Sequence, residues 1–541
     1  MGKGLWSTRT AGSAAAEAQL SVRRRRMLTL AMLAAASLVI ALCASAAIAE
    51  TGAPTTAPAQ PAGLPVTVTV DQSAPGPPVP RRFLGLSFEA AALGQLTQYA
   101  ERGDLVRLLR SLGPGVLRFG GITADENVAW SDAATPRPAW ASSTIGPEQM
   151  QALGVLARRS GWKVLLTVGL AHDEPAAAAR EVAAAHHALG ANLAAVEIGN
   201  EPDSYGAHGF RQMPWIAQGY EEETSEYREA IAALTPGVPI AGPDVSGSGA
   251  FGEWGEEEAL SQKPALLTGH HYPLGCAQTP APSIEALLSP AIREREAQSL
   301  TTYISISDTY RIPFRMDETN SVSCGGAPGI SDTFASTLWA TAYITQAMGA
   351  GAAGINLQGN PTNCVGYTPL CAPDPAALAS GSLRAQPDWY ALLLTSSLVG
   401  EDPLPSTITE GSPNLVAASF AGPDHLLKVV LVDDEPVGAS PLALRLNVGA
   451  GLGAGRVLRL TAPAQNATGG VLLGGRAVAA TGSWSNSTPA ESVSASTGTI
   501  ALALAPDSVA LVTDGPRPTA APRHRRTRSG GSPLLSYDGR R

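Results

Sequence analysis

Two glutamates lie where acid–base or nucleophilic chemistry is usually placed. Glu201 lies in the stretch Val196–Asp203, in which an apolar, β-branched run gives way to an amide, the glutamate and a proline. This pattern is typical of a buried parallel strand that emerges at the C-terminal rim of a (β/α)8 barrel. Glu318 comes 117 residues later, in a second run of the same kind, Ile312–Asn320. A pair of strand-end carboxylates, each near an amide, is what glycoside hydrolysis requires.

The two glutamates suit different roles. Two carboxyl groups roughly 5–5.5 Å apart can cleave a glycosidic bond with retention, one as acid and base and the other as nucleophile. We assign Glu201 as the acid/base and expect burial or a neighbouring charge to raise its pKa. We assign Glu318 as the nucleophile rather than its neighbour Asp317, because side-chain alternation should direct only one of the two towards the barrel axis. The plainer alternative for either glutamate is a salt-bridged residue at a strand end.

Other polar residues at predicted strand ends are candidates for substrate binding. We expect Asn200 to hold the sugar hydroxyl next to the reacting carbon, and Tyr272 to donate a hydrogen bond to Glu318. Glu89 and Asp125 are candidates for binding further hydroxyl groups. A core tyrosine at a strand end is the structural alternative for Tyr272.

Three further side chains at the same rim favour structural roles. We expect Arg118 to pack beneath the site in an ion pair, with a catalytic carboxylate as a potential partner. His270 and His271 are better explained as hydrogen-bonded structural histidines than as reacting groups. The pair Gly325-Gly326 is suited to a turn, and such a turn can present backbone N–H groups to an anion.

The elements that must position these residues alternate as βα units. From Arg82 to about Val399, short apolar runs alternate with helical patterns, which predicts an α/β fold built on a (β/α)8 TIM barrel. The eight candidate strands are Phe83–Phe88, Val116–Phe119, Lys163–Val168, Ala194–Ile198, Pro239–Ala241, Leu266–His271, Phe314–Glu318 and Gly354–Leu357. The candidate helices are Asp104–Leu112, Pro147–Ser160, Pro175–Leu189, Trp215–Leu234, Gly255–Gln262, Ile284–Tyr310, Ser331–Met348 with Ser331 as its N-cap, and Trp389–Val399.

The rest of the chain predicts a second, all-β domain. Beyond Pro403, short strands separated by Gly, Pro and Asn indicate a C-terminal β-sandwich, which the alternating strand Val66–Val70 could complete. We therefore divide the chain into a signal peptide or membrane anchor (1–49), a linker plus N-terminal strand (50–80), the catalytic barrel (81–400), the β-sandwich (401–514) and a disordered basic tail (515–541). Asn466 and Asn486 each open a glycosylation triplet, a pattern that also arises by chance.

Residues 1–49 have the features of an export signal. Arg23 to Arg26 form a basic cluster, Met27–Ala49 carries no charge, and Ala47-Ile48-Ala49 resembles a cleavage site. We therefore expect a secreted or extracellular protein. The apolar run is longer than is usual for a signal peptide, so an uncleaved membrane anchor is the alternative.

The charge of the chain argues against some partners. The formal net charge is −9, and loss of residues 1–49, which carry six basic residues and one acidic residue, would make it more negative by five. Lys163, Lys263 and Lys428 would be the lysines that remain. Nucleic acid binding is not expected without a basic face, and a long polyanion such as heparin is disfavoured. A small acidic carbohydrate is not excluded, because a few local groups suffice to bind it.

Four cysteines follow the export segment, and an even number in an exported chain suggests disulfides. Of the three pairings we favour Cys364–Cys371, which closes a small loop, with Cys276–Cys324, which ties two active-site loops together. A metal site is the weaker interpretation, because no CxxC or clustered His/Cys spacing accompanies these residues. We expect the chemistry to need neither a metal nor a cofactor.

Several motifs together resemble a known family. Ile198–Asp203 resembles the acid/base strand of the large clan of retaining (β/α)8 glycosidases. The combined set resembles glycoside hydrolase family 79, which includes heparanase and microbial β-glucuronidases. The resemblance runs from about Arg82 to Val399 and weakly through the β-domain. The further motifs are Phe83–Glu89, Leu117–Gly121, His271–Pro273, Glu318–Ser321, Gly325-Gly326, Ser331–Phe334 and, in the β-domain, Pro506–Leu511.

This resemblance implies a retaining β-glycosidase with Glu201 as acid/base and Glu318 as nucleophile. It also implies that backbone groups and a tyrosine in the loop after the nucleophile, plus a tyrosine after strand eight, hold a uronic carboxylate. Tyr367 matches the second tyrosine. Ser323 and Cys324, followed by Gly325, replace the first, which leaves glucuronide specificity open. We include Ser323, Gly325 and Tyr367 among the substrate-binding candidates.

We therefore expect an exported retaining β-glycosidase that hydrolyses β-glucuronides or related β-hexosides by double displacement through a glycosyl-enzyme intermediate. One alternative is another specificity in the same clan, such as an arabinofuranosidase or a glucosidase. The other is a non-catalytic cell-surface carbohydrate-binding protein, against which the presence of both glutamates argues.

Overall fold

A computed structural model describes residues 63–516, apart from 410–412, 424–425, 450–451 and 486–490. The predicted export segment, the glycosylation triplet at Asn486 and residues 517–541 of the predicted tail lie outside the described residues. Within the described part of the chain, no helix is long and apolar enough to cross a membrane.

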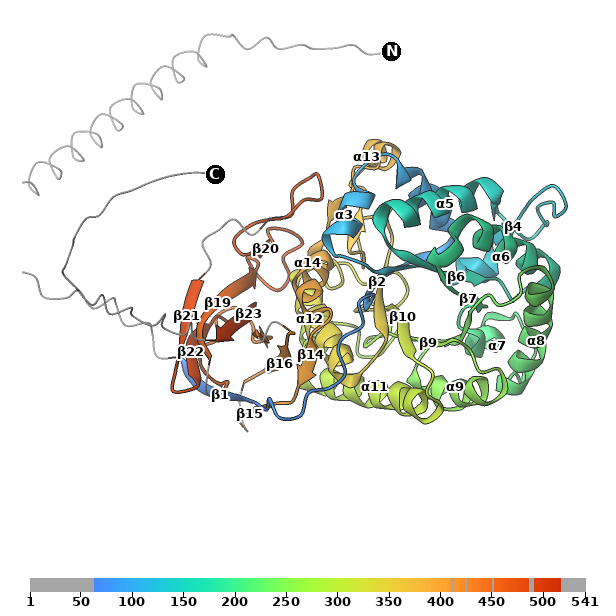
Figure 1. Ribbon diagram of the computed structural model, residues 1–541. Coiled ribbons are helices and arrows are strands. Elements are labelled where there is room, and N and C mark those ends of the chain that lie inside the picture. The colour runs from blue at the N-terminus through green and yellow to red at the C-terminus, as the bar shows by residue number, and fades with distance from the viewer. Residues whose placement is uncertain (1–62, 410–412, 424–425, 450–451, 486–490, 517–541) are drawn as a thin grey trace, which may run out of the picture. The chain divides into compact units, whose positions relative to one another are not determined.

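Eight parallel strands close into a barrel, and helices surround it (Figure 1). Nearly every residue of these strands is buried, because inward side chains fill the barrel and outward ones pack against helices. The barrel strands are β2 (Leu84–Glu89), β3 (Val116–Gly120), β6 (Lys163–Val168), β7 (Leu193–Ile198), β8 (Ile240–Val245), β9 (Leu266–His271), β10 (Phe314–Thr319) and β11 (Gly354–Gly359). All eight predicted strands are thus present, in the order β10-β11-β2-β3-β6-β7-β8-β9 around the barrel.

The main helices follow the predicted pattern closely. They are α3 (Leu105–Ser111), α5 (Pro147–Ser160), α6 (Pro175–Leu189), α8 (Ala217–Leu234), α9 (Ser248–Ser261), α11 (Pro290–Tyr310), α12 (Phe334–Ala350) and α14 (Pro387–Thr395). Shorter elements lie between them: α2 (Leu93–Thr97), α4 (Thr123–Glu126), β4 (Val128–Trp130), β5 (Ser143–Ile145), α7 (Tyr205–His208), α10 (Ile284–Leu287), β12 (Leu370–Cys371), α13 (Pro375–Ser380) and β13 (Arg384–Ala385).

Three predicted helix boundaries are wrong. Helix α9 begins at Ser248 rather than Gly255, because its early glycines hide the helical pattern. The long helix predicted over Ile284–Tyr310 is two helices, and the second starts with Pro290 in its first turn, where proline is tolerated. Helix α12 has Thr333 rather than Ser331 at the N-cap position.

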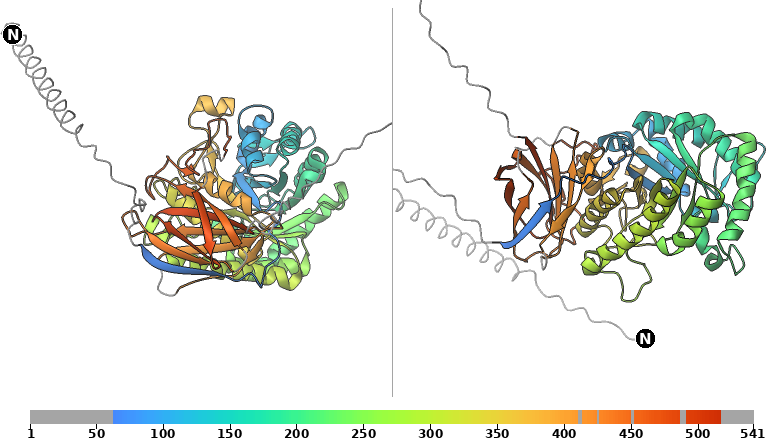
Figure 2. Two further views of the ribbon diagram at one scale, coloured as in Figure 1. Left: turned by 60° about the vertical axis from the view of Figure 1, so that its left-hand side comes forward. Right: turned by 60° about the horizontal axis from the view of Figure 1, so that its bottom comes forward.

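The β-domain is one continuous sheet whose two halves share a core. Strand β1 (Leu64–Val70) pairs in parallel with β18 (Leu442–Asn447) and antiparallel with β15 (Ser406–Ile408). The N-terminal strand thus completes this sheet, as predicted (Figure 2). Side chains of β1 and β18 pack in one cluster with those of β17 (Leu427–Asp433) and β23 (Ser508–Pro516), as in a sandwich. The remaining strands are β14 (Asp402–Leu404), β16 (Leu415–Ala421), β19 (Leu452–Thr461), β20 (Leu472–Leu473), β21 (Glu491–Ser496) and β22 (Thr499–Leu504).

Candidate active site

The two predicted catalytic glutamates meet at the C-terminal mouth of the barrel. One carboxylate oxygen of Glu201, one of Glu318 and a ring nitrogen of His270 all lie within 4.8 Å of one another. The side chains of Glu201 and Glu318 are 22% and 9% exposed, so neither is sealed from solvent. This separation is compatible with the short spacing of a retaining carboxylate pair.

Glu201 sits on a sharply turned segment beyond β7. Its φ is +46°, in the left-handed region, and Gly199 just before it has φ +82°. Glycine is required at position 199, because a Cβ there would lie 2.6 Å from the hydroxyl of Tyr205. The N–H of Glu201 donates to the carbonyl of Asp244 at 2.9 Å. A non-glycine residue in this conformation persists where the surroundings fix it, which is a frequent feature of functional sites.

Arg118 forms the centre of a buried ionic network beneath the catalytic pair. Its guanidinium is fully buried and also donates to Oδ1 of Asn200 at 3.0 Å. Burial opposes the charge of Arg118, but its four acidic partners raise its pKa well above the usual value. The predicted ion pair beneath the site is therefore confirmed. The carboxylate contacts are Glu318 at 2.6 Å, Asp244 at 2.7 Å, Glu197 at 2.9 Å and Asp317 at 2.9 Å.

The reason given for preferring Glu318 over Asp317 is wrong, because a bulge in β10 breaks the alternation. Met316 pairs with Gly269 and Glu318 with the next residue of β9, which leaves Asp317 as an extra residue. Both carboxylates therefore reach Arg118. Burial still favours Glu318 over Asp317 as the nucleophile. Asp317 is 0% exposed, and desolvation and nearby acids raise its pKa well above the usual value.

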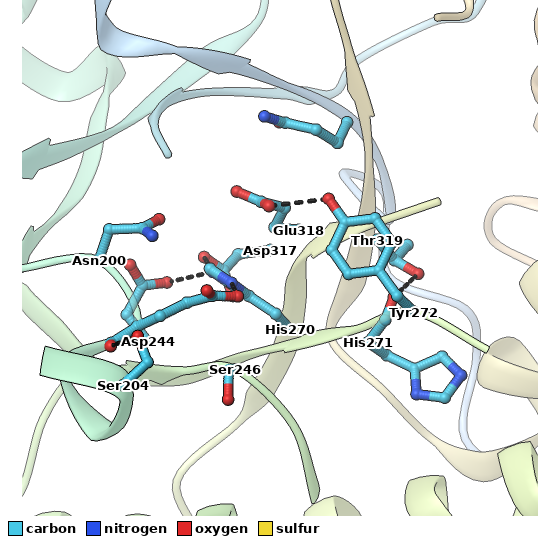
Figure 3. Close-up of polar contacts among 12 residues, drawn as sticks. Asn200, Ser204, Asp244, Ser246, His270, His271, Tyr272, Asp317, Glu318 and Thr319 are labelled. Carbon is cyan, nitrogen blue, oxygen red and sulfur yellow. Dashed lines mark hydrogen bonds and ion pairs between the residues drawn. The ribbon is translucent and has the colours of Figure 1, made fainter. Parts of the chain in front are cut away.

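Tyr272 contacts the candidate nucleophile as predicted. Its hydroxyl donates to Oε1 of Glu318 at 2.8 Å (Figure 3). The ring of Tyr272 stacks on that of Tyr367, with centroids 5.9 Å apart. The two glutamate oxygens are thus bound by different donors, Tyr272 on Oε1 and Arg118 on Oε2.

The loop after β10 brings Gly325 next to Tyr367. The N–H of Tyr367 donates to the carbonyl of Gly325 at 3.2 Å. Burial raises the pKa of the Tyr367 hydroxyl, and a hydrogen bond from the backbone of the nearby Gly325 lowers that pKa in part. The Ser323 hydroxyl accepts from the N–H of Cys276 at 3.1 Å, so it ties this loop to the one after β9.

Both predicted disulfides are present. Cys276–Cys324 joins the loops after β9 and β10, and Cys364–Cys371 closes a short loop around Tyr367. Their Cα atoms are 6.0 and 5.3 Å apart, within the usual range.

Glu89 lies at the end of β2, and the residue as a whole is partly buried. Its Oε2 accepts from the N–H of Thr123 at 3.0 Å and from the hydroxyl of the same residue at 2.6 Å. Its Oε1 accepts from Gln358 at 3.4 Å. Burial, together with the negative charge of Glu318, raises the pKa of Glu89 to about 7.

Asp125 does not have the sugar-binding role that we predicted. It is 0% exposed, and its oxygens accept from four donors. These donors are the N–H groups of Leu170 at 2.7 Å, Ala171 at 3.0 Å and Asn200 at 2.8 Å, and the hydroxyl of Tyr205 at 2.7 Å. Asp125 therefore positions Asn200 and the turn that leads to Glu201.

Sequence reasoning missed Asp244 and underestimated His270. One ring nitrogen of His270, Nδ1, lies 2.9 Å from Oε1 of Glu201, and the other lies 2.9 Å from Oδ1 of Asp244. Burial opposes a charge on His270, but Glu318, Asp244 and Asp317 raise its pKa well above the usual value. The signal for Asp244 was present, because it follows an apolar run as Glu201 does, but the predicted strand stopped at Ala241.

Comparisons with known proteins find the same architecture among glycosidases. No protein-family model matches the chain. A β-glucuronidase of Aspergillus niger is 28% identical over 171 residues, which cover 28% of this chain and 31% of the relative. The chain thus matches about a third of the length of that curated relative. Two solved structures each align over 83% of this chain and over their own full length. One is a 4-O-α-L-rhamnosyl-β-D-glucuronidase from Fusarium oxysporum 12S, with a TM-score of 0.67 and 19% identity. The other is a family 51 arabinofuranosidase from Xanthomonas axonopodis pv. citri, with a TM-score of 0.59 and 14% identity. These similarities show the fold, a TIM barrel with a β-domain.

Two groups of side chains have spacings that could suit a metal ion. They are Glu201, His270 and Glu318, and Asp244, His270 and Asp317. Arg118 already forms ion pairs with acids of both groups. A second positive charge at such short range would be repelled by that guanidinium, so the donor set fits an acid–nucleophile pair better than a cation.

Proposed function

We propose that this protein is a retaining β-glycosidase that hydrolyses β-glucuronides or closely related β-hexosides. The observation that carries this proposal is the approach of the Glu201 and Glu318 carboxylates to within 4.8 Å, with separate donors on the two oxygens of Glu318. The partial match to a β-glucuronidase supports the substrate class.

The geometry supports a double displacement. Glu318 would attack the anomeric carbon while Glu201 protonates the departing oxygen, which gives a glycosyl ester and a free alcohol. Glu201 would then take a proton from water as the water oxygen attacks the same carbon and releases Glu318. Arg118 donates to Oε2 of Glu318 at 2.6 Å and Tyr272 donates to Oε1 at 2.8 Å, so the carboxylate is held in one orientation for the attack.

A uronic carboxylate has a suitable place beside the nucleophile. Tyr367 stacks on Tyr272, which donates to Glu318, and the N–H of Tyr367 donates to the carbonyl of Gly325 at 3.2 Å. A tyrosine hydroxyl and a backbone N–H can both donate to an anion. Ser323 stands where the resemblance implied a tyrosine, and its hydroxyl already accepts from Cys276. We propose Tyr367 and Gly325 as the main carboxylate contacts, with Asn200 and Glu89 binding sugar hydroxyls.

The first experiment compares kcat/KM on aryl β-glucuronide, β-glucoside, β-galactoside, β-xyloside and α-L-arabinofuranoside. We expect the glucuronide to be the best substrate, whereas a preference for the arabinofuranoside would favour the other clan specificity. Glu318→Gln should lose several orders of magnitude in kcat, and Glu201→Gln should recover activity on substrates with activated leaving groups. Folded wild-type protein that turns over none of these glycosides would disprove the enzyme class and favour a binding protein.

We also propose that the protein is exported. The proposal rests on the basic cluster and the uncharged run within residues 1–49. N-terminal sequencing of protein recovered from the medium or the membrane would test it, and a new N-terminus near Glu50 is the expected result.

A further inference from the structure

Asp244 is a fully buried acid near the C-terminal end of β8. An irregularity of the backbone places it there, because the pairing of β8 with β9 passes from Pro243 directly to Val245 and leaves Asp244 as an extra residue. Its φ is +62°, in the left-handed region. A non-glycine residue keeps this conformation only where its surroundings hold it, and the contacts of Asp244 show what holds it.

Asp244 is connected to the acid/base residue Glu201 by two routes. Its backbone carbonyl accepts the N–H of Glu201 at 2.9 Å. Its Oδ1 lies 2.9 Å from Nε2 of His270, and Nδ1 of the same ring lies 2.9 Å from Oε1 of Glu201 (Figure 3). A partner on one ring nitrogen fixes the orientation of the other. Asp244 therefore acts on both the backbone and the carboxyl group of Glu201.

The second oxygen of Asp244 is connected to the nucleophile. Oδ2 accepts from Nη2 of Arg118 at 2.7 Å, and Nη1 of the same guanidinium donates to Oε2 of Glu318 at 2.6 Å. Nη2 also donates to Oδ1 of Asn200 at 3.0 Å. A continuous series of side-chain contacts thus joins the two catalytic glutamates, and Asp244 lies at its centre.

The charges along this series agree with its geometry. Burial favours the neutral form of Asp244, but Arg118 and His270 lower its pKa below the usual value. Burial also opposes a charge on His270, but the surrounding acids raise its pKa well above the usual value. An imidazolium donates from both nitrogens, so the ring can donate to Asp244 and to Glu201 at once. Asp317 lies 3.6 Å from the same ring, which is too far for a hydrogen bond.

We propose that Asp244 is a positioning residue for proton transfer: through His270 it holds the carboxyl group of Glu201 in the orientation that protonates the departing oxygen. The same orientation serves the second step, in which Glu201 takes a proton from water. The inference rests on the proposed glycosidase function and adds to it a residue that is too deeply buried to touch the substrate. A misdirected Glu201 impairs the steps that need proton transfer and spares those that do not.

Asp244→Asn tests the proposal, because the amide keeps the shape of the side chain but turns an NH2 group towards one of its two donors. Glu197→Gln is the matched control. Glu197 is equally buried and contacts Arg118 at 2.9 Å, but in the described part of the chain no hydrogen bond or ion pair joins it to His270. Two aryl β-glycosides of the sugar that the wild type prefers are compared. Dinitrophenolate departs without a proton, whereas phenolate needs one.

We expect Asp244→Asn to raise the ratio of kcat/KM on the dinitrophenyl glycoside to that on the phenyl glycoside at least about tenfold. Glu197→Gln should keep this ratio within about twofold of the wild type, because a disturbed arginine affects the attack on both substrates alike. Azide needs no general base, and its nitrogen bonds to the anomeric carbon as the ester bond to Glu318 breaks. Azide should therefore raise kcat of Asp244→Asn on the dinitrophenyl glycoside at least about fivefold, with a glycosyl azide as product.

His270→Gln keeps the test valid if denaturant unfolding shows that Asp244→Asn does not fold. It removes the ring nitrogen beside Glu201, so it should change the ratio in the same direction and respond to azide. Where both single variants fold, the double variant should be no worse than the weaker of them, because the two residues act in series. Equal losses on the two glycosides, or no response to azide, in a folded variant would overturn the proposal. A wild-type protein that hydrolyses no aryl glycoside would instead refute the proposed function.

Discussion

Nη1 of Arg118 lies 2.6 Å from Oε2 of Glu318, in a part of the barrel where the guanidinium is completely buried. Because both side chains are largely withdrawn from water, salt and solvent screen this ion pair little. The same guanidinium also contacts the carboxyl groups of three further buried acids, Glu197, Asp244 and Asp317. Stability and the reactivity of the nucleophile therefore depend on one side chain.

Arg118→Ala should be severely destabilising. Removal of one partner from a buried ion pair typically costs about 3–5 kcal/mol, because the remaining charges are left unpaired. Arg118→Lys keeps a charge but loses the planar fork, so it should fold more readily yet lose at least about tenfold in kcat. Denaturant unfolding and kinetics on the aryl glycoside check both results. The exposed Arg107→Ala should change stability by less than about 1 kcal/mol, and an equally small effect at Arg118 would contradict the network.

Asp125→Asn tests whether Asp125 positions the site. Its carboxylate accepts from three N–H groups and a tyrosine hydroxyl, and an amide NH2 would face some of these donors. We expect a loss of about 1–3 kcal/mol in unfolding free energy and a lower kcat, because Asn200 would shift. The neighbouring exposed Glu126→Gln is the control. A variant that kept wild-type stability but lost substrate affinity would restore the sugar-binding role that the sequence first suggested.

Much of this fold could be predicted because buried parallel strands appear in the sequence as apolar runs that end in polar residues. Glu201, Glu318 and Tyr272 were found in this way, since the ends of such strands meet at one rim. The disulfide Cys276–Cys324 followed from the same reasoning, because both cysteines lie in loops after neighbouring strands.

What could not be predicted depends on single inserted residues and on tertiary contacts. Asp317 is an extra residue in β10, and Asp244, with φ +62°, lies at an irregularity in β8. Such bulges change which side chains point inwards, and a pattern with a period of two cannot reveal them. The four hydrogen-bond donors of Asp125 come from segments that are distant in the sequence. The sequence pattern therefore did not reveal them, and Asp125 was assigned to substrate binding instead.

Stability should fall as the pH rises, because the β-domain contains aspartates that retain protons. Burial raises the pKa of Asp433 to about 7, of Asp434 to about 8 and of Asp507 to about 7. The unfolded chain releases these protons near pH 4, so between about pH 4 and 8 the native state binds more protons than the unfolded state. By linkage, the unfolding free energy then decreases with pH over that window and levels off above it. Thermal unfolding from pH 5 to 8.5 should show a falling Tm.

Asp507→Asn isolates one of these groups. Asp507 is 4% exposed, neither of its carboxylate oxygens has a hydrogen-bond partner among the described residues, and its φ of +57° suits asparagine. We expect the variant to be more stable than wild type above pH 7, by about 1–3 kcal/mol, and to show a shallower dependence of Tm on pH. The exposed Asp308→Asn is the control. A slope identical to that of the wild type would show that Asp507 does not carry a proton in the native state.

The disulfide between Cys276 and Cys324 should matter for both stability and selectivity. It closes a loop with a sequence separation of 48, for which chain entropy predicts a stabilisation of about 4 kcal/mol. It also fixes the loop that places Gly325 next to Tyr367. Replacement of both cysteines by serine should therefore lower the unfolding free energy and raise KM for the aryl glucuronide more than for the aryl glucoside. Since the glucoside lacks the carboxylate, an equal rise in both KM values would contradict the proposed carboxylate contacts and leave the disulfide with a purely structural role.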